Sequence, residues 1–247
     1  MSRRQSSACN PEHRDEAGFR TGRPGTGPIA GRPLFCWSSV MTVKTFPLVT
    51  GAADLRSRVQ VLGRPSPVPA EPGVYAWYFR DLPPGIDTSG CHQTEKLTLL
   101  YVGISPREPS ANGRAPSRST LRKRLLTHFC GNAEGSTLRR TLGCLLAPHT
   151  GFPLRRVGSG LRMTFTNPGE LALDAWMNEN AMVAWQTCEQ PWRLERDILQ
   201  SGLPLPLNIR DNPCQAHTAL VKAVRSAAMA EARQQPVVAD SGGARRR

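Results

Sequence analysis

Gly73-Val74-Tyr75-Ala76-Trp77-Tyr78-Phe79 has the most regular strand pattern in this chain, and the expected fold is arranged around it. Even-numbered and odd-numbered side chains of this run would point to opposite faces, and both sets are apolar, as in a central strand that is covered on two sides. Leu97–Ile104 is a second run of this kind. The loop between them contains Pro83-Pro84-Gly85 and Thr88-Ser89-Gly90 and is longer than a tight hairpin. The sequence therefore predicts an antiparallel pair of strands with an extended tip.

Further elements follow these two strands along the chain. Apolar residues at helical spacing, with helix start and stop signals, predict helices over about 117–130, from about 136 onward, and over about 168–180, 191–200 and 213–232. A short strand is expected at 161–165 and a third main strand at Met182–Cys188. In the second helix, inward-facing leucines would leave Arg139 and Arg140 on the outer faces.

The two ends of the chain differ in composition from its middle. Residues 1–45 are rich in Arg, Gly, Pro and Ser without apolar periodicity, so we expect a disordered extension. We expect a linker or partly ordered lead-in at 46–69, a folded core at 70–212, an additional helix at 213–232 and a disordered basic tail at 233–247. A more protein-like run begins at Met41, which predicts that the natural start is Met41.

The formal net charge is +13, and the positive charge is concentrated in one region. Between Arg114 and Arg162 there are ten arginines or lysines and one acid, Glu134. A charge run is often only a solvated face. Here it alternates with leucines on two predicted helices, which favours a structured basic surface that attracts a polyanion. No segment approaches the roughly 18 apolar residues of a membrane span, so the expected partner is nucleic acid and no membrane contact is expected.

The seven cysteines are scattered and contain no Cys-x-x-Cys pair. This argues against a disulfide scaffold and against a zinc site. The amino terminus also lacks the apolar stretch of a signal peptide. We therefore expect a reducing, cytoplasmic location.

Several short motifs occur in an order that is found in a known family. Gly73-Val74-Tyr75 and Tyr101-Val102-Gly103 precede Arg124-x-x-x-His128, and Glu195 and Asn208 follow. This order resembles the GIY-YIG nuclease family. Further motifs resemble a prokaryotic branch of it, distantly similar to the amino-terminal nuclease domain of the excision-repair excinucleases: Ser136–Arg140, Ala175–Met177 and Pro191-Trp192. The resemblance covers about 70–212 and implies an α+β fold with a small antiparallel three-stranded sheet flanked by helices.

The resemblance also implies catalytic roles. Tyr75 and Tyr101 would flank the attacking water, and Arg124 would hold the scissile phosphate, which a guanidinium matches bidentately. His128 would contact the phosphate or donate a hydrogen bond to another site residue, although such a histidine is more often simply a residue on the helix surface. A tyrosine whose pKa is lowered by the metal and the arginine could take the proton from water. On pattern alone, each tyrosine is better explained as a packing residue, and only their pairing favours a catalytic role.

Glu195 would bind the metal and Asn208 would buttress the site. Mg²⁺ or Mn²⁺ needs only one or two carboxylates together with the substrate phosphate, so a single Glu195 is enough. Glu189 and Asp197 are the competing carboxylates, and Asn208 could instead cap a turn.

The sequence thus predicts a Mg²⁺- or Mn²⁺-dependent endonuclease that hydrolyses DNA, or RNA, by a single-metal mechanism. Five basic residues are expected to bind the nucleic acid: Arg118, Arg122, Lys123, Arg139 and Arg140. Of these, Arg122 and Lys123 also compete with Arg124 for the catalytic role. The alternative is a non-catalytic nucleic-acid-binding module of the same fold. Repair, restriction, mobile-element and defence roles, the oligomeric state and any protein partners are left open.

Overall fold

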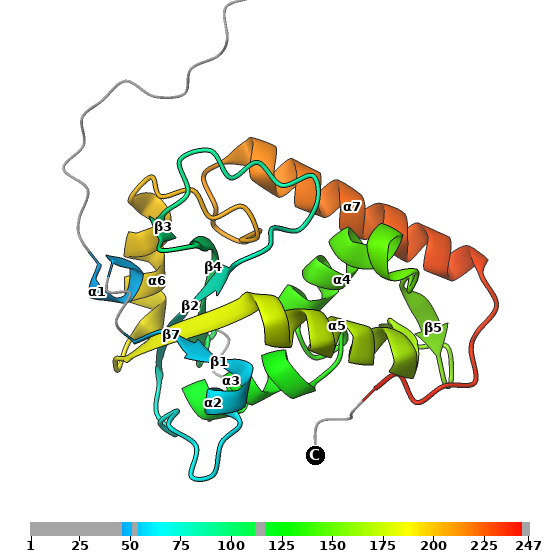
Figure 1. Cartoon of the computed structure of the whole chain (residues 1–247), viewed down its shortest axis with the longest axis horizontal. Coiled ribbons are helices and arrows are strands. Elements are labelled where there is room, and N and C mark those ends of the chain that lie inside the picture. The colour runs from blue at the N-terminus through cyan, green and yellow to red at the C-terminus, as the bar shows by residue number, and fades with distance from the viewer. Residues whose placement is uncertain (1–45, 51–53, 112–116, 244–247) are drawn as a thin grey trace, which may run out of the picture. The chain divides into compact units, whose positions relative to one another are not determined.

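Helices cover both faces of the sheet at the centre of this protein (Figure 1). The computed structural model describes residues 46–50, 54–111 and 117–243, all of which belong to one unit, Thr42–Arg247. The predicted extension at 1–45 lies outside the described residues, as do residues 244–247. In the described part of the chain, no helix is both long and apolar enough to cross a membrane.

The main sheet has five strands in the order β1-β7-β2-β4-β3, and every neighbouring pair is antiparallel. The three long strands are β2 (Gly73–Phe79), β4 (Leu97–Ser105) and β7 (Ala181–Thr187). At the edges lie β1 (Arg56–Ser57) and β3 (Gln93–Thr94). The predicted α+β class is confirmed, but the prediction of three strands is wrong. The two edge strands have two residues each, and such short segments have no alternation that a sequence pattern could reveal.

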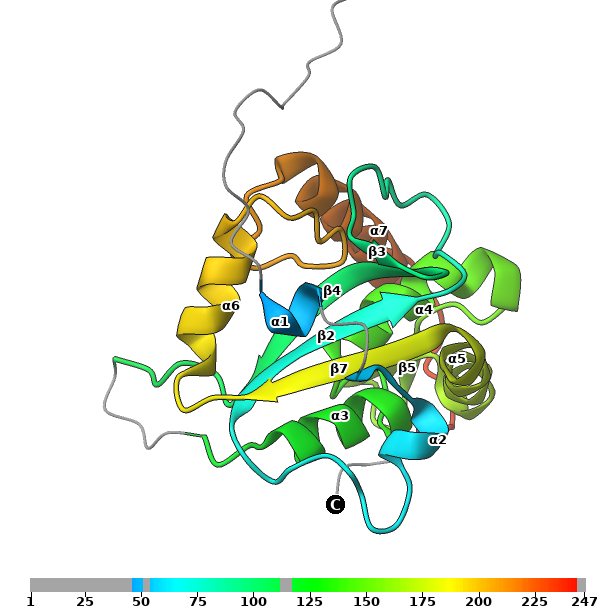
Figure 2. The same cartoon turned by 60° about the vertical axis from the view of Figure 1, so that its left-hand side comes forward.

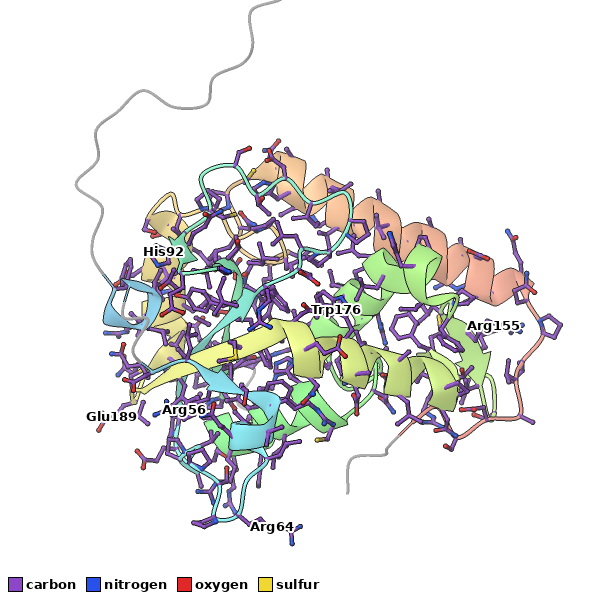
Figure 3. All side chains as sticks on the ribbon, in the orientation of Figure 1. Arg56, Arg64, His92, Arg155, Trp176 and Glu189 are labelled. Carbon is purple, nitrogen blue, oxygen red and sulfur yellow. The ribbon has the colours of Figure 1, made fainter. Side chains whose placement is uncertain are left out.

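Both faces of β2 are buried along its whole length. The face with Tyr75, Trp77 and Phe79 packs against α2 (Arg58–Val61), α3 (Leu121–Cys130), α4 (Thr137–Thr150) and α5 (Thr166–Asn180). The opposite face packs against α1 (Pro47–Thr50) and α6 (Pro191–Gln200) (Figure 2). Trp176 of α5, labelled in Figure 3, stacks on Phe79 with the ring centroids 5.8 Å apart. Both apolar sets of the first predicted strand are therefore core residues.

The last helix and the segment after it pack on the α4 side of the molecule. α7 (Gln215–Gln234) lies beside α4 (Figure 1), and its carboxyl end meets the hairpin of β5 (Arg155–Val157) and β6 (Arg162–Thr164). Val238 then exchanges backbone hydrogen bonds with this hairpin, and Asp240 accepts from the Asn167 amide at the start of α5. The chain at 235–243 therefore differs from the disordered tail expected from the sequence. Its partners are distant in sequence, so local composition could not indicate them.

One arginine forms a buried ion pair that ties α3, α4 and α5 together. Arg139 of α4 is fully buried, and its guanidinium donates to Glu170 Oε2 at 2.7 Å and to Asp174 Oδ1 at 2.6 Å, both on α5. It also donates to the carbonyl oxygens of His128 and Phe129 at the end of α3, which have no partner within that helix. The prediction that Arg139 lies on an outer face and binds nucleic acid is therefore wrong, because two acids from α5 make its burial favourable.

We expect Arg139→Met to lower the free energy of unfolding by about 3–5 kcal/mol, because it leaves the Glu170 carboxylate buried without its counterion. Adding Glu170→Gln should restore part of this loss. Urea unfolding of both variants measures the effect.

The matched control is Arg196→Met, which breaks the Arg196–Glu108 pair, whose side chains are 50% and 46% exposed. It should change the unfolding free energy by no more than about 1 kcal/mol. An Arg139→Met variant as stable as this control would contradict the importance of the buried pair.

Candidate active site

The pairing of β2 with β4 places the two predicted tyrosines on the same face of the sheet. Tyr75 lies opposite Gly103, and Trp77 lies opposite Tyr101. Residues that lie opposite one another on antiparallel strands share a face, and so do residues two apart on one strand. The ring centroids of Tyr75 and Tyr101 are 6.5 Å apart. Two segments that are distant in sequence thus bring their phenols into contact.

The glycines of both tripeptides are required by close packing. A Cβ atom at Gly103 would lie 2.6 Å from the Tyr75 hydroxyl oxygen, so the Tyr75 ring occupies the space that any other side chain would need. A Cβ atom at Gly73 would collide with the carbonyl oxygen of Gln186 on β7. The two motifs therefore describe a packing geometry in which Tyr75 crosses over the neighbouring strand.

A chain of hydrogen bonds runs from Arg124 through Tyr75 to the start of α4. Arg124 Nε donates to the Tyr75 hydroxyl at 3.3 Å, and Arg124 Nη1 donates to the Gly135 carbonyl at 3.2 Å. The Tyr75 hydroxyl lies 2.9 Å from His128 Nε2, and His128 Nδ1 lies 2.7 Å from Ser136 Oγ. Because Tyr75 accepts from Arg124, its own proton is available to His128.

Burial raises the pKa of both tyrosines above the usual value of a phenol. For Tyr75, which is 1% exposed, burial is the largest cause, and the charge and hydrogen bond of Arg124 oppose it. The sequence led us to expect a lowered pKa, but the arginine alone does not achieve this. The loss of water around the ring outweighs the attraction of one guanidinium. Tyr75 is therefore a neutral phenol in this arrangement.

Five of the six predicted catalytic residues line one cleft of about 650 Å³: Tyr75, Tyr101, Arg124, Glu195 and Asn208. The sixth, His128, is fully buried and reaches the cleft through its hydrogen bond to Tyr75. The cleft also has Gly103 and Ile104 of β4 in its lining, and the competing carboxylates Glu189 and Asp197 are not among its lining residues. The structure thus brings together side chains from β2, β4, α3, α6 and the segment after α6.

Glu195 enters the cleft from α6, which packs on the opposite face of the sheet. Its side chain is partly buried, and burial raises the pKa of its carboxyl to about 7. Nearby Arg210 and Arg107 oppose this rise, whereas Asp211 adds to it. In the described part of the chain, the Glu195 carboxyl takes part in no hydrogen bond and no ion pair. A carboxylate in such a place is costly in its charged form.

This environment fits a divalent cation. A cation beside Glu195 would favour the charged carboxylate and offset its burial. Among the described residues, there is no group of three or more His, Cys, Asp or Glu side chains that could hold a metal ion by themselves. A cation at Glu195 would therefore take its other ligands from water and from a bound phosphate, as Mg²⁺ commonly does.

Asn208 is fixed to the strand that carries Tyr101. Its side-chain oxygen accepts from the Val102 amide at 2.9 Å, and its Nδ2 donates to the Val102 carbonyl at 2.8 Å. Asn208 is 4% exposed, and the neighbouring Leu207 amide donates to Leu100 on the same strand. The segment around Asn208 therefore runs along β4 and satisfies its backbone groups beside Tyr101.

The residues expected to bind nucleic acid lie in different environments. Arg118 and Lys123 are exposed. Arg122 is partly buried and donates to the Val68 carbonyl at 2.6 Å. Arg140 is partly buried and pairs with Glu134 at 2.9 Å, close to the cleft, and Arg139 belongs to the buried ion pair. The choice of Arg124 over Arg122 and Lys123 as the arginine of the cleft agrees with its contact with Tyr75.

Sequence reasoning missed three residues of the site. Ser136, the partner of His128, begins the Ser136–Arg140 motif and caps α4 by accepting from the Arg139 amide, but neither signal indicated its contact with His128. Arg107 lies just after β4 and lines the cleft. Arg225 of α7 also lines it and occupies an otherwise apolar stripe of its helix, which is a signal that the sequence contains.

Glu195 makes the stability of the protein depend on pH. Its carboxyl has a pKa near 4.5 when exposed and about 7 in the folded protein, so between these values the folded state binds more protons. Stability from this group is therefore lost as pH rises through the folded pKa.

In the presence of a chelator, we expect the free energy of unfolding of Glu195→Gln to exceed that of the unchanged protein by roughly 1–3 kcal/mol at about pH 8. At about pH 4 the two free energies of unfolding should be nearly equal, because the Glu195 carboxyl is then protonated in the folded state.

Urea unfolding at both pH values measures this difference, and the exposed Glu189→Gln is the control. A stabilisation of the same size at both values, or the same gain in the control, would show that the Glu195 carboxyl is not strained by burial.

Comparison with known proteins supports the grouping of these residues. The family model of the GIY-YIG catalytic domain matches residues 73–233, from the first tripeptide into α7. A search of curated proteins and a search of solved structures each gave no match. GIY-YIG nucleases generally use divalent metal ions, which agrees with the environment of Glu195. Because the match covers more than half of the chain and includes the whole cleft-lining set on β2, β4, α3 and α6, this protein belongs to the GIY-YIG nuclease family.

Proposed function

We propose that this protein is an endonuclease that hydrolyses phosphodiester bonds in DNA and uses Mg²⁺ or Mn²⁺ held by Glu195. The observation that carries the proposal is that Tyr75, Tyr101, Arg124 and Glu195 line one cleft. Phenol, guanidinium and carboxylate are the groups that this hydrolysis needs, and here they come together from four separate elements, β2, β4, α3 and α6. The basic composition of the chain, with a formal net charge of +13, favours a polyanionic substrate.

Arg124 would hold the scissile phosphate. Two of its N–H groups donate to Tyr75 and Gly135, which fixes the plane of the guanidinium. Its other N–H groups have no hydrogen bond within the described residues and are available to the non-bridging oxygens of a phosphodiester. Charge builds up on these oxygens in the transition state, where a fixed guanidinium stabilises it without reorganisation.

Tyr75 and His128 would move the proton of the attacking water. The water gives its proton to the Tyr75 oxygen, and Tyr75 gives its own proton to His128 Nε2, 2.9 Å away. Because burial holds the Tyr75 phenol neutral, this second transfer is what allows Tyr75 to act as a base. The hydroxide oxygen then forms the new bond to phosphorus, and the bond from phosphorus to the leaving oxygen breaks.

Glu195 would hold the metal ion in the cleft that it shares with Tyr75. A bound Mg²⁺ supplies Lewis-acid stabilisation of the charge on the phosphate and the leaving oxygen. Tyr101, which is partly exposed in the cleft, would flank the water, and Asn208 would keep the Tyr101 strand in position through Val102.

We expect Glu195→Gln to lower the rate of nicking of supercoiled plasmid DNA in the presence of Mg²⁺ by about 10²-fold or more, the usual cost of removing a group that stabilises transition-state charge. Glu189→Gln is the control, since Glu189 lies outside the cleft on the exposed segment before α6 (Figure 3). It should nick at the rate of the unchanged protein.

Equal nicking by Glu195→Gln and the unchanged protein would contradict the assignment. An unchanged protein that binds DNA but cuts it with neither Mg²⁺ nor Mn²⁺ would favour the non-catalytic binding module instead. Cleavage of an RNA strand and not of DNA would correct the substrate class.

A further inference from the structure

α7 packs on the rest of the protein through one stripe, and an arginine lies within it. Val221 and Ala232 are fully buried, and Ala228 and Met229 pack partly buried against the core. Arg225 follows Val221 by one helical turn and precedes Met229 by another, so it projects from the same side of the helix. A charged side chain thus occupies a position where the helix otherwise carries apolar residues.

The Arg225 side chain reaches the candidate active site. It lines the same cleft as Tyr101 and Arg124, although it comes from a helix that packs against α4 and not against the sheet (Figure 1). The charge with the largest effect on it is another cation, Arg140, and the pKa of Arg225 is lowered by its burial first and by this neighbour second. Arg225 therefore enters the cleft from the helix that packs on α4.

No anion of the described protein neutralises Arg225. Its guanidinium makes no hydrogen bond and no ion pair within the described residues. Four other arginines near this cleft each have a partner: Arg124 with Tyr75, Arg140 with Glu134, Arg196 with Glu108 and Arg210 with Asp211. Arg107 also lines the cleft and has no partner among the described residues, but its side chain is exposed to solvent, whereas that of Arg225 is half-buried. Glu134, the carboxylate on the α4 side, already accepts from Arg140 and from the Met163 amide.

A half-buried guanidinium beside a second cation is electrostatically unfavourable unless an anion approaches it. An arginine with a purely structural role would cover apolar surface with its stem and extend its head to open solvent. Arg225 instead lines the cleft with Arg124 and Tyr101, and Tyr101 is near enough to act on the pKa of its guanidinium. Both its position and its lack of a partner are explained by an anionic ligand that enters the cleft.

We propose that Arg225 binds a second phosphate group of the substrate, next along the strand from the phosphate held by Arg124. This inference rests on the proposed function, and it makes α7 part of the nucleic-acid-binding surface. The substrate then needs at least two phosphates, one for Arg124 and one for Arg225, so it is a polynucleotide and not a small phosphodiester. The strand would lie in the cleft in contact with both α3 and α7.

Binding of a short fluorescein-labelled DNA duplex to the full chain, measured by anisotropy over a range of salt concentrations, tests the inference. All variants carry Glu195→Gln so that the probe stays intact. We expect Arg225→Gln to weaken binding about fivefold or more and to lower the slope of log K against log salt by roughly 0.9, the value for one lost phosphate contact. Arg225→Lys keeps the charge and should keep the slope.

The matched control is Lys222→Gln, which removes one positive charge from the exposed side of the same helix. It should leave the slope unchanged. Two results would show that Arg225 holds no phosphate: the same slope of log K against log salt for Arg225→Gln and Lys222→Gln, or a slope for Arg225→Lys that is lowered as much as that for Arg225→Gln. DNA binding by the parent chain would still support the proposed function in either case. If the parent chain does not bind DNA even at low salt, the proposed function fails and this inference fails with it.

Discussion

The buried guanidinium of Arg139 is the interaction on which the rest of the structure depends most. It neutralises Glu170, reaches Asp174 and donates to the last carbonyls of α3, so one side chain fixes three helices relative to one another. The other oxygen of Glu170 accepts from the amides of Ala133 and Phe165, which pins the turn between α3 and α4. His128 is one of the residues whose carbonyl Arg139 holds, and Ser136 follows that turn. The buried pair therefore positions the hydrogen-bond chain that ends at Tyr75.

The cleft differs from this network, because two of its partly buried charges are left uncompensated. Glu195 is partly buried without a partner in the described part of the chain, and Arg225 is half-buried beside another cation. Such groups destabilise the protein alone, but a metal ion and a phosphate strand would satisfy both. A rigid, fully paired network next to a poorly paired cleft is the arrangement expected of a preorganised binding site.

The sequence was most informative where the pattern was local. The alternation over 73–79 predicted a strand buried on both faces, and the motif order predicted which side chains meet in the cleft. The burial of Arg139 depends on acids that lie on another helix, so periodicity alone placed it on the wrong face. β1 and β3 are too short to have a pattern, and the pKa of Tyr75 depends on burial that no motif encodes. The sequence shows Arg225 as a charged residue in an otherwise apolar stripe. Its role could be inferred only once the structure had shown where α7 lies relative to the cleft.

The assignment of the cleft is tested most directly by a crystal structure of a Tyr75→Phe variant with Mn²⁺ and a short DNA strand. Anomalous scattering should place Mn²⁺ about 2 Å from a Glu195 carboxylate oxygen and from a phosphate oxygen, the distance expected for a hard divalent cation. The same phosphate should accept hydrogen bonds from Arg124. Mn²⁺ bound at Asp211 or Glu108 with none at Glu195, or a DNA strand that passes outside the cleft, would contradict the assignment.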